Sequence, residues 1–552
     1  MGRDVTEERL ANTNYQFAPD EAPTFPGSPF APRHNPWRRV GYAATGTLVG
    51  IATSFPNALT SVNVGTISGS LGLYVAQASW LPAIFYAMNA SGNLTLVKAR
   101  IQFGIPAVTY AILICYSAVA VAQIAIPSFG MAVLVRAVNG LMGAALVSLS
   151  VYYFLQVFPA KVRPLALLFG VSLPQLGSPL ARLVPVELLA VDHWQGLHLI
   201  ELAVGLCVLT SISLFPLPPS QRSRAFERLD FLTIACVVSA MLLSCAVLGL
   251  GRVLWWTDTP WLGWMLIAAV PLFMLAAAIE TTRQNPLVHF EWLGTIGMLR
   301  FAAIALLVRL ALAEQTFGSV GLLFSGGLNN DQLHTLFWIV ILAMALGLVT
   351  AALTLSEQRI PYQVIAAAVL IAIGALMDSQ ATSLTRPPQL YLSQALIGFG
   401  TTLFVGPALL FGFLQLIRKG PDHLITLVVL FSITQNVGAL AGSAVVGSYQ
   451  VIQIHAHAAA LSEDLLASNP QVLDRLQSGA RALSPVIVDP SLGGAEGASL
   501  LGNSLMQQAS ILAFNDVFRL LALLAFGTAL YVGWLVVLRS IRGGSNVKRI
   551  AA

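Results

Sequence analysis

The sequence predicts an all-α polytopic membrane protein that crosses a lipid bilayer about fourteen times. Hydrophobic residues make up 56% of the chain and charged residues only 10%, whereas a soluble domain carries roughly 25% charged residues. Apolar runs long enough to span a membrane follow one another along the chain. The Lys and Arg residues are scattered between these runs instead of clustered, so the expected surroundings are lipid and not nucleic acid.

The predicted membrane spans are apolar runs of roughly twenty residues with few charges. They lie at about 40–64, 77–97, 105–126, 131–157, 164–189, 197–217, 231–251, 261–281, 300–324, 333–355, 361–379, 389–415, 424–447 and 511–538. Most of the 29 Lys and Arg residues fall in every second connection between these spans. By the positive-inside rule, this alternation places both termini in the cytoplasm.

The chain divides into four parts by composition. Residues 1–39 are polar and lack the apolar core of a cleaved leader, so we expect a flexible cytoplasmic tail. Residues 40–217 hold six spans, and 218–299 form a linker with two more. Residues 300–552 hold six spans, a long polar stretch at 448–510 on the outer side and a cytoplasmic tail. No other loop is as long as 448–510, which makes this stretch the expected contact for a partner protein.

Glycine and proline gather in the fifth predicted span, at Gly170, Pro174, Gly177 and Pro179. The first three fall at i, i+4 and i+7 and share one helix face. Membrane helices are generally enriched in Gly and Pro, but this cluster exceeds that background. Proline removes a backbone hydrogen bond and glycine permits close helix contact, so the cluster predicts a conformational hinge.

Several segments resemble, in order and spacing, the fourteen-span drug:proton antiporters of the major facilitator superfamily, and among them the EmrB-type exporters. These segments are LTSVNVGTISGSLG (59–72), QASWLPAIFYAMNASG (77–92), LVRAVNGLMGA (134–144), FPAKVRPLAL (158–167), HWQGLHLIELAVG (193–205) and ILAFNDVFRLLAL (511–523). The resemblance implies two bundles of six helices, with two helices inserted between them, that rock around a cavity at the membrane midplane. It also implies the inner membrane of a bacterium, a periplasmic adaptor of the membrane-fusion type and an outer-membrane channel.

The sequence departs from that family where protons are usually bound. Ala58 stands where the family's first span carries an aspartate, and the cytoplasmic motif LVKARIQFG (96–104) contains no acid. Glu201 replaces an asparagine of the family's sixth span. The resemblance therefore predicts the fold but not the residue that couples protons.

Charged residues inside the predicted spans are the first candidates for proton coupling or for the cavity wall, because a charge in a bilayer is costly. They are Glu314, Arg309, Arg136, Glu201 and Asp516. Glu314 is preferred as the proton carrier because it lies near the middle of the ninth span, the counterpart of the span that lacks its acid. Two roles are equally compatible with Arg136: a charge that faces the cavity, or a donor to the backbone carbonyls of a neighbouring helix. Glu201 and Asp516 are expected near span ends, within reach of water.

Other ionisable residues are given structural roles. Asp378 lies at a span end and is expected to be solvated, and Arg182 and Glu187 are expected to pair at the outer end of the fifth span. His455 and His457 in the polar stretch lack a third ligand nearby, so no metal site is predicted. No other cofactor is expected either.

Amide and aromatic residues of the early spans are candidates for lining a cavity that binds flat apolar ligands. They are Phe55, Asn57, Asn63, Phe85, Tyr86, Asn89 and Asn139. Each of them also fits a core or interfacial position.

These features favour a secondary active transporter that exports hydrophobic or amphiphilic drugs and other toxic small molecules in exchange for protons. The alternative is an exporter of an organic anion, such as an aromatic acid or a siderophore, with Arg136 and Arg309 binding the anion. A membrane enzyme is the weakest alternative, because no loop supplies a constellation of His, Asp or Cys. The G-x-x-x-x-G-K-[ST] motif of ATP-binding proteins does not occur.

Overall fold

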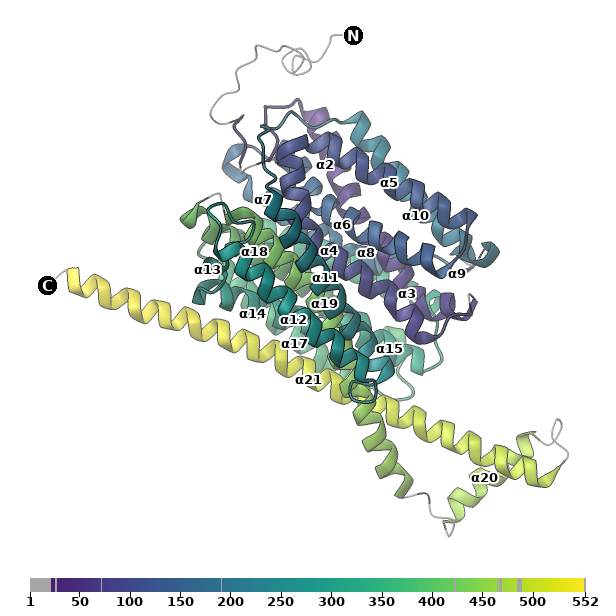
Figure 1. The fold of residues 1–552 in the computed structure, drawn as a ribbon. Coiled ribbons are helices and arrows are strands. Elements are labelled where there is room, and N and C mark those ends of the chain that lie inside the picture. The colour runs from purple at the N-terminus through teal and green to yellow at the C-terminus, as the bar shows by residue number, and fades with distance from the viewer. Residues whose placement is uncertain are drawn as a thin grey trace.

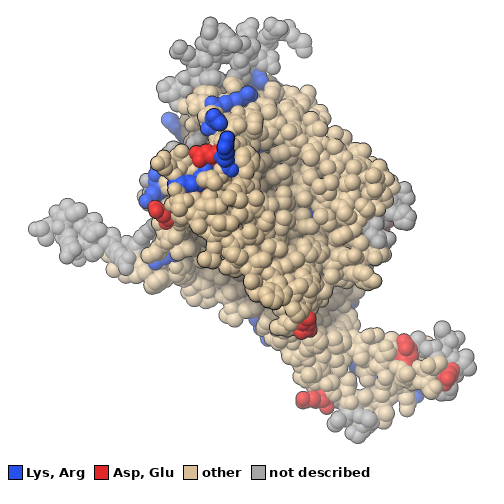
Figure 2. Space-filling view, in the orientation of Figure 1, with Lys and Arg blue, Asp and Glu red and all other residues tan. Residues whose placement is uncertain are grey.

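The protein is an all-α polytopic membrane protein, as predicted. The computed structural model describes residues 21–24, 27–70, 72–189, 191–420, 423–463, 465, 469–483 and 489–550. Within these ranges, the only β structure is one isolated bridge, and 11 helical segments are long and apolar enough to cross a bilayer. Figure 2 shows a broad uncharged belt on the visible face of the body. The count of fourteen spans stays a prediction, and residues 1–20 of the predicted tail lie outside the described ranges.

The first six predicted spans correspond to helices that pack around α6 (Phe129–Val157). The other helices are α2 (Pro36–Ala52), α3 (Phe55–Ser70), α4 (Val75–Phe103), α5 (Ile105–Ala125), α7 (Pro164–Ser172), η3 (Leu173–Leu176), α8 (Gly177–Ala181), α9 (Val186–Leu189) and α10 (Val191–Leu214). α6 contacts α2, α4, α5 and α7. Gly140 allows α6 to approach α4 closely, because any larger residue would place its Cβ only 2.5 Å from the Phe85 carbonyl oxygen.

The remaining helices form a second bundle and the predicted inserted pair (Figure 1). The pair is α11 (Arg228–Leu254) and α12 (Pro260–Thr281). The bundle comprises α13 (Phe290–Leu293), α14 (Ile296–Ala311), η4 (Glu314–Gly318), α15 (Ser319–Ser325), α16 (His334–Leu353), α17 (Ile360–Asp378), α18 (Tyr391–Lys419), α19 (Leu424–Glu463) and α21 (Pro490–Ile550). α11 packs on both α4 and α19, so it touches both bundles.

A cluster of charged side chains fixes the inserted pair to the first bundle at the end predicted to be cytoplasmic. Lys98 of α4 donates to Asp230 of α11 at 2.6 Å. Arg283, after α12, forms ion pairs of 2.8 Å with Asp230, Glu227 and Glu280. The hydrogen bond from Arg283 lowers the pKa of the Glu227 carboxyl. A network of this kind is worth more than isolated surface pairs, and it joins three helices.

Two spans of the first bundle break where proline removes a backbone donor. Pro56 has no N–H for the carbonyl of Ala52, and the chain breaks between α2 and α3 at that point. Pro174 lies in the 3₁₀ turn η3 between α7 and α8. The two breaks touch, because the Ser54 hydroxyl donates to the Pro174 carbonyl and a Cβ on Gly177 would lie 2.1 Å from that hydroxyl oxygen.

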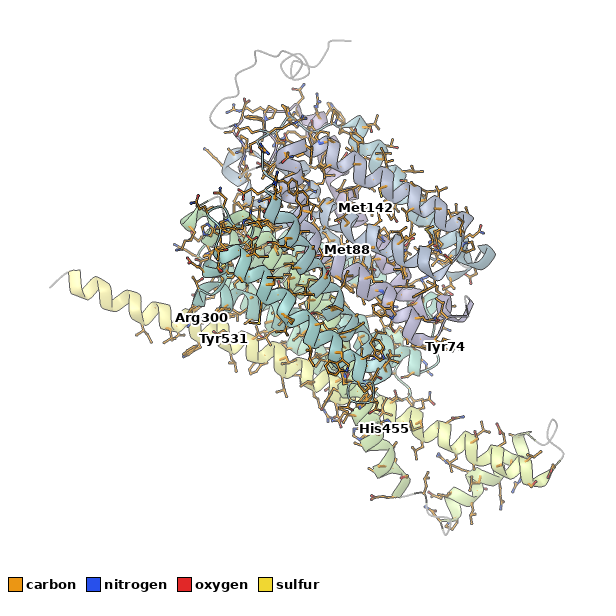
Figure 3. The ribbon with its side chains drawn as sticks, in the orientation of Figure 1. Tyr74, Met88, Met142, Arg300, His455 and Tyr531 are labelled. Carbon is orange, nitrogen blue, oxygen red and sulfur yellow. The ribbon has the colours of Figure 1, made fainter. Side chains whose placement is uncertain are left out.

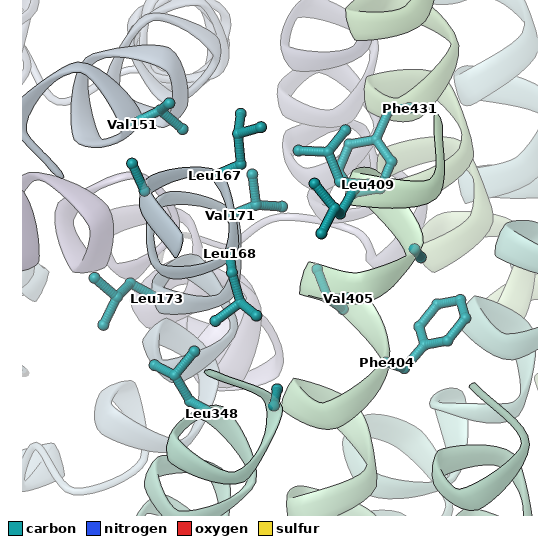
Figure 4. Packing of buried hydrophobic residues seen from close by; sticks show 14 of the residues in the cluster. Val151, Leu167, Leu168, Val171, Leu173, Leu348, Phe404, Val405, Leu409 and Phe431 are labelled. Carbon is teal, nitrogen blue, oxygen red and sulfur yellow. The ribbon is translucent and has the colours of Figure 1, made fainter. Parts of the chain in front are cut away.

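The two bundles meet through an apolar contact between α7 and α18. Figure 4 shows Leu167, Leu168 and Val171 of α7 facing Val405 and Leu409 of α18. These side chains are buried. α18 approaches α7 closely at its Gly406, where a Cβ would lie 2.7 Å from Leu168 Cγ. The contact holds the bundles together on one side of the space between them.

The polar stretch 448–510 folds as a helical hairpin that projects from the body (Figure 1). α19 continues to Glu463, α20 (Pro470–Leu483) turns back, and α21 starts at Pro490. Figure 3 places His455 on α19 where that helix leaves the body. α20 packs against α21. Gly497 allows the close contact, because a Cβ at that position would lie only 2.6 Å from the Leu476 carbonyl oxygen. The described residues of the longest connection therefore present a helical surface.

Candidate functional site

A cavity of about 590 Å³ lies between the two bundles. Its wall is built from both halves and from α11 of the inserted pair. The broken helices contribute to it directly: Ser54 and Asn57 flank the first break, and Pro174 and Gln175 lie in η3. From the second bundle, Gln315 and Phe317 of η4 take part. Irregular backbone in a membrane protein is tolerated where it lines such a cavity.

The charged residues of the cavity wall are all arginines. Arg182, Arg252 and Arg309 line it, and no Asp, Glu, Lys or His does so in the described part of the chain. None of the three guanidinium groups forms an ion pair with a described carboxylate within 4.0 Å. An unpaired positive charge inside a membrane protein is expensive, so three in one cavity mark a binding function.

Arg309 of α14 lies between the two halves. Its Nε donates to the Gln435 carbonyl of α19 at 3.2 Å, and its Nη1 donates to Gln175 Oε1 of η3 at 3.3 Å. The side chain of Gln435 lines the cavity, and both polar atoms of its buried amide lack a partner. Buried polar atoms are nearly always satisfied, so an unpaired amide in a wall that also holds an unpaired cation indicates room for a polar ligand.

The other two arginines lie over aromatic rings. Arg182 Cζ is 5.3 Å from the centroid of Phe337, and Arg182 Nη1 donates to Asn330 Oδ1 at 2.9 Å. Arg252 Cζ lies 5.1 Å from the centroid of Phe317. Cation–π contacts position a guanidinium without neutralising it, so both keep their charge available to the cavity.

Four of the seven predicted cavity residues line the cavity: Asn57, Phe85, Tyr86 and Asn89. Asn89 also joins the halves, because Asn436 Nδ2 of α19 donates to Asn89 Oδ1 at 2.9 Å.

The other three predicted cavity residues, Phe55, Asn63 and Asn139, are not part of the cavity wall. Asn63 donates to the Leu59 carbonyl of its own helix, and Asn139 is fully buried within the first bundle. Among the predicted hinge residues, Pro174 and Pro179 line the cavity, whereas Gly170 and Gly177 pack against Val151 and the Ser54 hydroxyl.

Arg136 and Glu201 form a buried ion pair in the first bundle and do not line the cavity. Arg136 Nη2 lies 2.5 Å from Glu201 Oε1, and its Nη1 donates to the Pro56 carbonyl at 3.3 Å. Thr60 donates to the same carboxylate at 3.3 Å, and His198 Nδ1 lies 3.2 Å from Glu201 Oε2. The expectation that Glu201 is within reach of water is wrong, because the residue is 0% exposed. A neighbouring arginine satisfies the carboxylate there in place of solvent.

Glu314 lies in a buried cluster with a second acid, Asp378. Gln394 Nε2 donates to both carboxyl groups, at 2.9 Å to Glu314 Oε1 and 2.7 Å to Asp378 Oδ2. Asp378 is only 2% exposed, so the expectation that it is solvated is wrong. The end of α17 packs on α18 and buries this residue. Glu314 and Arg309 are not partners, as their spacing on one helix predicts.

Asp516 lies at the base of the hairpin, away from the cavity wall. His457 Nε2 is 2.7 Å from Asp516 Oδ2, and Arg519 Nη1 donates to Asp516 Oδ1 at 3.2 Å. This arrangement fits a structural tie between α19 and α21. The expected pair of Arg182 and Glu187 is not formed, because Arg182 turns to Asn330.

Sequence reasoning did not select Arg182, Arg252, Asp378, Gln394 or Gln435 as site residues. Arg182 and Arg252 lie at the ends of apolar runs, where a charge is usually solvated. The two glutamines are ordinary polar residues within spans until their partners are known. A single glutamine inside an apolar run was the available signal, but it points to no particular chemistry.

Comparison with known proteins places the fold. The sequence matches no protein-family model and no curated protein. Structures of proton-dependent oligopeptide transporters are similar to it, one with a TM-score of 0.55 and 13% identity over 91% of this chain and 99% of that one. A bacterial homologue of the human drug peptide transporters PepT1 and PepT2 has a TM-score of 0.51 and 13% identity over 91% and 99% of the two chains.

A third similar structure is the proton:xylose symporter XylE of the major facilitator superfamily. Its TM-score is 0.47, with 15% identity over 89% of this chain and 95% of that one. At such identities the likeness concerns the fold and not the cargo. The chain has the fold of the oligopeptide transporter structures, here with two helical bundles, breaks in the first and fifth predicted spans and a cavity between the bundles.

Proposed function

We propose that this protein is a secondary active transporter whose cargo is an amphiphilic organic anion. The observation that supports this proposal is the sign of the cavity: three arginines and no acidic residue line it in the described chain. A cationic drug would add positive charge to a wall that already holds three unpaired cations. An anion would neutralise part of that charge where water is scarce.

The rest of the wall favours a cargo with an aromatic or apolar body. Phe85, Phe317, Phe337, Phe413 and Phe431 line the cavity together with aliphatic side chains. Such walls bind flat apolar groups, while a few polar side chains fix their orientation. Of the two transport functions that the sequence suggests, this composition favours the organic-anion exporter. Drugs remain cargo to the extent that they carry an acid group.

Outward transport coupled to proton entry is part of the proposal and rests on the resemblance to EmrB-type exporters. It agrees with the energetics of an anion. A membrane potential that is negative inside favours the exit of each negative charge by about 2.3 kcal/mol per 100 mV. Proton entry would add its own driving force. Localisation in the inner membrane of a bacterium, with cytoplasmic termini, belongs to the same proposal.

Transport of two matched probes tests the proposed function. We expect inside-out vesicles that contain the protein to accumulate 2-naphthoate when respiration energises them. Accumulation of 2-naphthylmethylammonium, which has the same ring with the opposite charge, should not exceed the level in vesicles without the protein. Accumulation of the cation, with none of the anion, would contradict the proposal. Vesicles without the protein correct for passive entry.

The helical hairpin is proposed as the contact for a periplasmic adaptor. It is the largest feature outside the body. α20 is amphipathic: one face of the helix packs on α21, and the opposite face is exposed. Deletion of residues 466–488 should prevent co-purification of an adaptor while insertion and 2-naphthoate binding persist. Undiminished co-purification would place the contact elsewhere.

A further inference from the structure

We propose that Glu314, Asp378 and Gln394 form a site that holds one proton between two carboxyl groups and that this site couples proton movement to the cargo cavity. The inference deepens the proposed function and rests on it for the coupling, but the presence of the shared proton is independent of any cargo. Its basis is the geometry of three buried side chains from three different helices.

One amide group serves both acids. The NH₂ of Gln394 lies 2.9 Å and 3.2 Å from the two oxygens of Glu314, and 2.7 Å from Asp378 Oδ2. Both acids are buried, with exposures of 0% and 2%. Two negative charges held this close without water repel each other strongly, so one carboxyl keeps a proton and donates it toward the other.

Neither acid of the site is neutralised by an ion pair in the described chain. No Lys, Arg or His of the described chain forms an ion pair with either acid. η4 packs against α15, α18 and α21. From α21, Phe518 packs on Gly318, and Asn515 donates to the Ala381 carbonyl at 2.9 Å. Asp516 of α21 pairs with His457 and with Arg519 at the hairpin base.

The proton site shares a turn of helix with the cavity wall. Glu314 begins the π-helical turn η4, which ends at Gly318. Gln315 and Phe317 of that turn line the cavity, and Arg252 lies over the Phe317 ring. Gln315 Nε2 also donates to the Gln394 carbonyl at 3.4 Å. Single π turns are less stable than regular α-helix and are frequent at functional sites.

This arrangement gives the coupling a physical route. An anion that binds Arg252 changes the contact between the guanidinium and the Phe317 ring, and so the position of η4. A shift of η4 moves Glu314 relative to Asp378 and Gln394. When the carboxyls separate, the shared proton leaves to water in the cavity and both groups become carboxylates. When they close again, one proton is taken up.

Counting protonated carboxyls tests the site without any cargo. Infrared spectra of the purified protein at pH 7 should show one protonated carboxyl fewer in the Glu314→Gln/Asp378→Asn double variant than in the wild type. Asp258→Asn, an exposed acid outside the cluster, should change nothing. No loss would mean that both groups are ionised, and loss of two would mean that each holds its own proton. Either result overturns the proposal.

Transport tests the coupling. Glu314→Gln should still bind 2-naphthoate and exchange it across vesicle membranes at equilibrium, while accumulation driven by an imposed pH gradient falls to the level seen without a gradient. Gradient-driven accumulation at the wild-type ratio would overturn the coupling role. Failure of the wild type to bind 2-naphthoate would instead count against the proposed cargo and leave the infrared result to decide on the site.

Discussion

Replacement of Arg309 by glutamine is expected to weaken 2-naphthoate binding by about a hundredfold. Arg309 contacts both halves of the molecule, through Gln175 and the Gln435 carbonyl. A hydrogen bond to a charged group is worth about 1.5–3 kcal/mol, and each 1.4 kcal/mol is a factor of ten in affinity. Titration of the purified protein in nanodiscs measures the change.

The same variant should stabilise the protein when no ligand is present. The guanidinium is partly buried and has no carboxylate partner, so its removal relieves the cost of holding an unpaired charge inside the membrane protein. We therefore expect Arg309→Gln to raise the melting temperature of the ligand-free protein and to abolish the further rise that 2-naphthoate causes in the wild type. Arg228→Gln, an exposed arginine at the start of α11, serves as the control. Wild-type affinity in Arg309→Gln would exclude this arginine from the site.

Replacement of Glu201 by glutamine is expected to have the opposite effect on stability. The carboxylate is fully buried, 2.5 Å from Arg136, and receives a hydrogen bond from Thr60. Removing one partner of a buried pair leaves an uncompensated charge and costs about 3–5 kcal/mol. Unfolding of the purified protein should therefore require markedly less heat or denaturant.

The double variant Arg136→Gln/Glu201→Gln separates the charge effect from the loss of packing. It removes both charges, so we expect it to recover most of the stability that Glu201→Gln loses. A coupling energy of this kind identifies a pair whose members act on each other. A double variant as unstable as the sum of the two single variants would show that Arg136 and Glu201 contribute separately.

The fold could be predicted from sequence because bilayer thickness and the cost of charge in lipid leave a strong pattern. Each of the predicted spans overlaps a helix, and Pro56 and Pro174 lie at the breaks of the first and fifth spans. The π turn at Glu314–Gly318 contains no proline, so no local signal marks it. The sequence predicts 448–510 as a long polar stretch on the outer side of the membrane. It does not predict the helices of this stretch, because they depend on the packing of α20 against α21.

The candidate site could be predicted only in part. Hydropathy identifies Glu314, Arg309 and Arg136 as costly charges, but it cannot tell which of them meets a counter-ion. That depends on which helices become neighbours: α10 brings Glu201 to Arg136, whereas no helix in the described part of the chain brings an acid to Arg309. For the same reason Asp378, which sequence places at a wet span end, turns out to be buried beside Glu314.

The charge preference of the purified protein tests the central claim most directly. Three pairs of aromatic acids and amines, with phenyl, naphthyl and biphenyl bodies, differ within each pair only in the sign of the charged group. Calorimetric titration in nanodiscs should show that the acid binds more tightly than the amine in every pair, with the difference lost in Arg309→Gln. Tighter binding of the amines would contradict a cavity that selects anions.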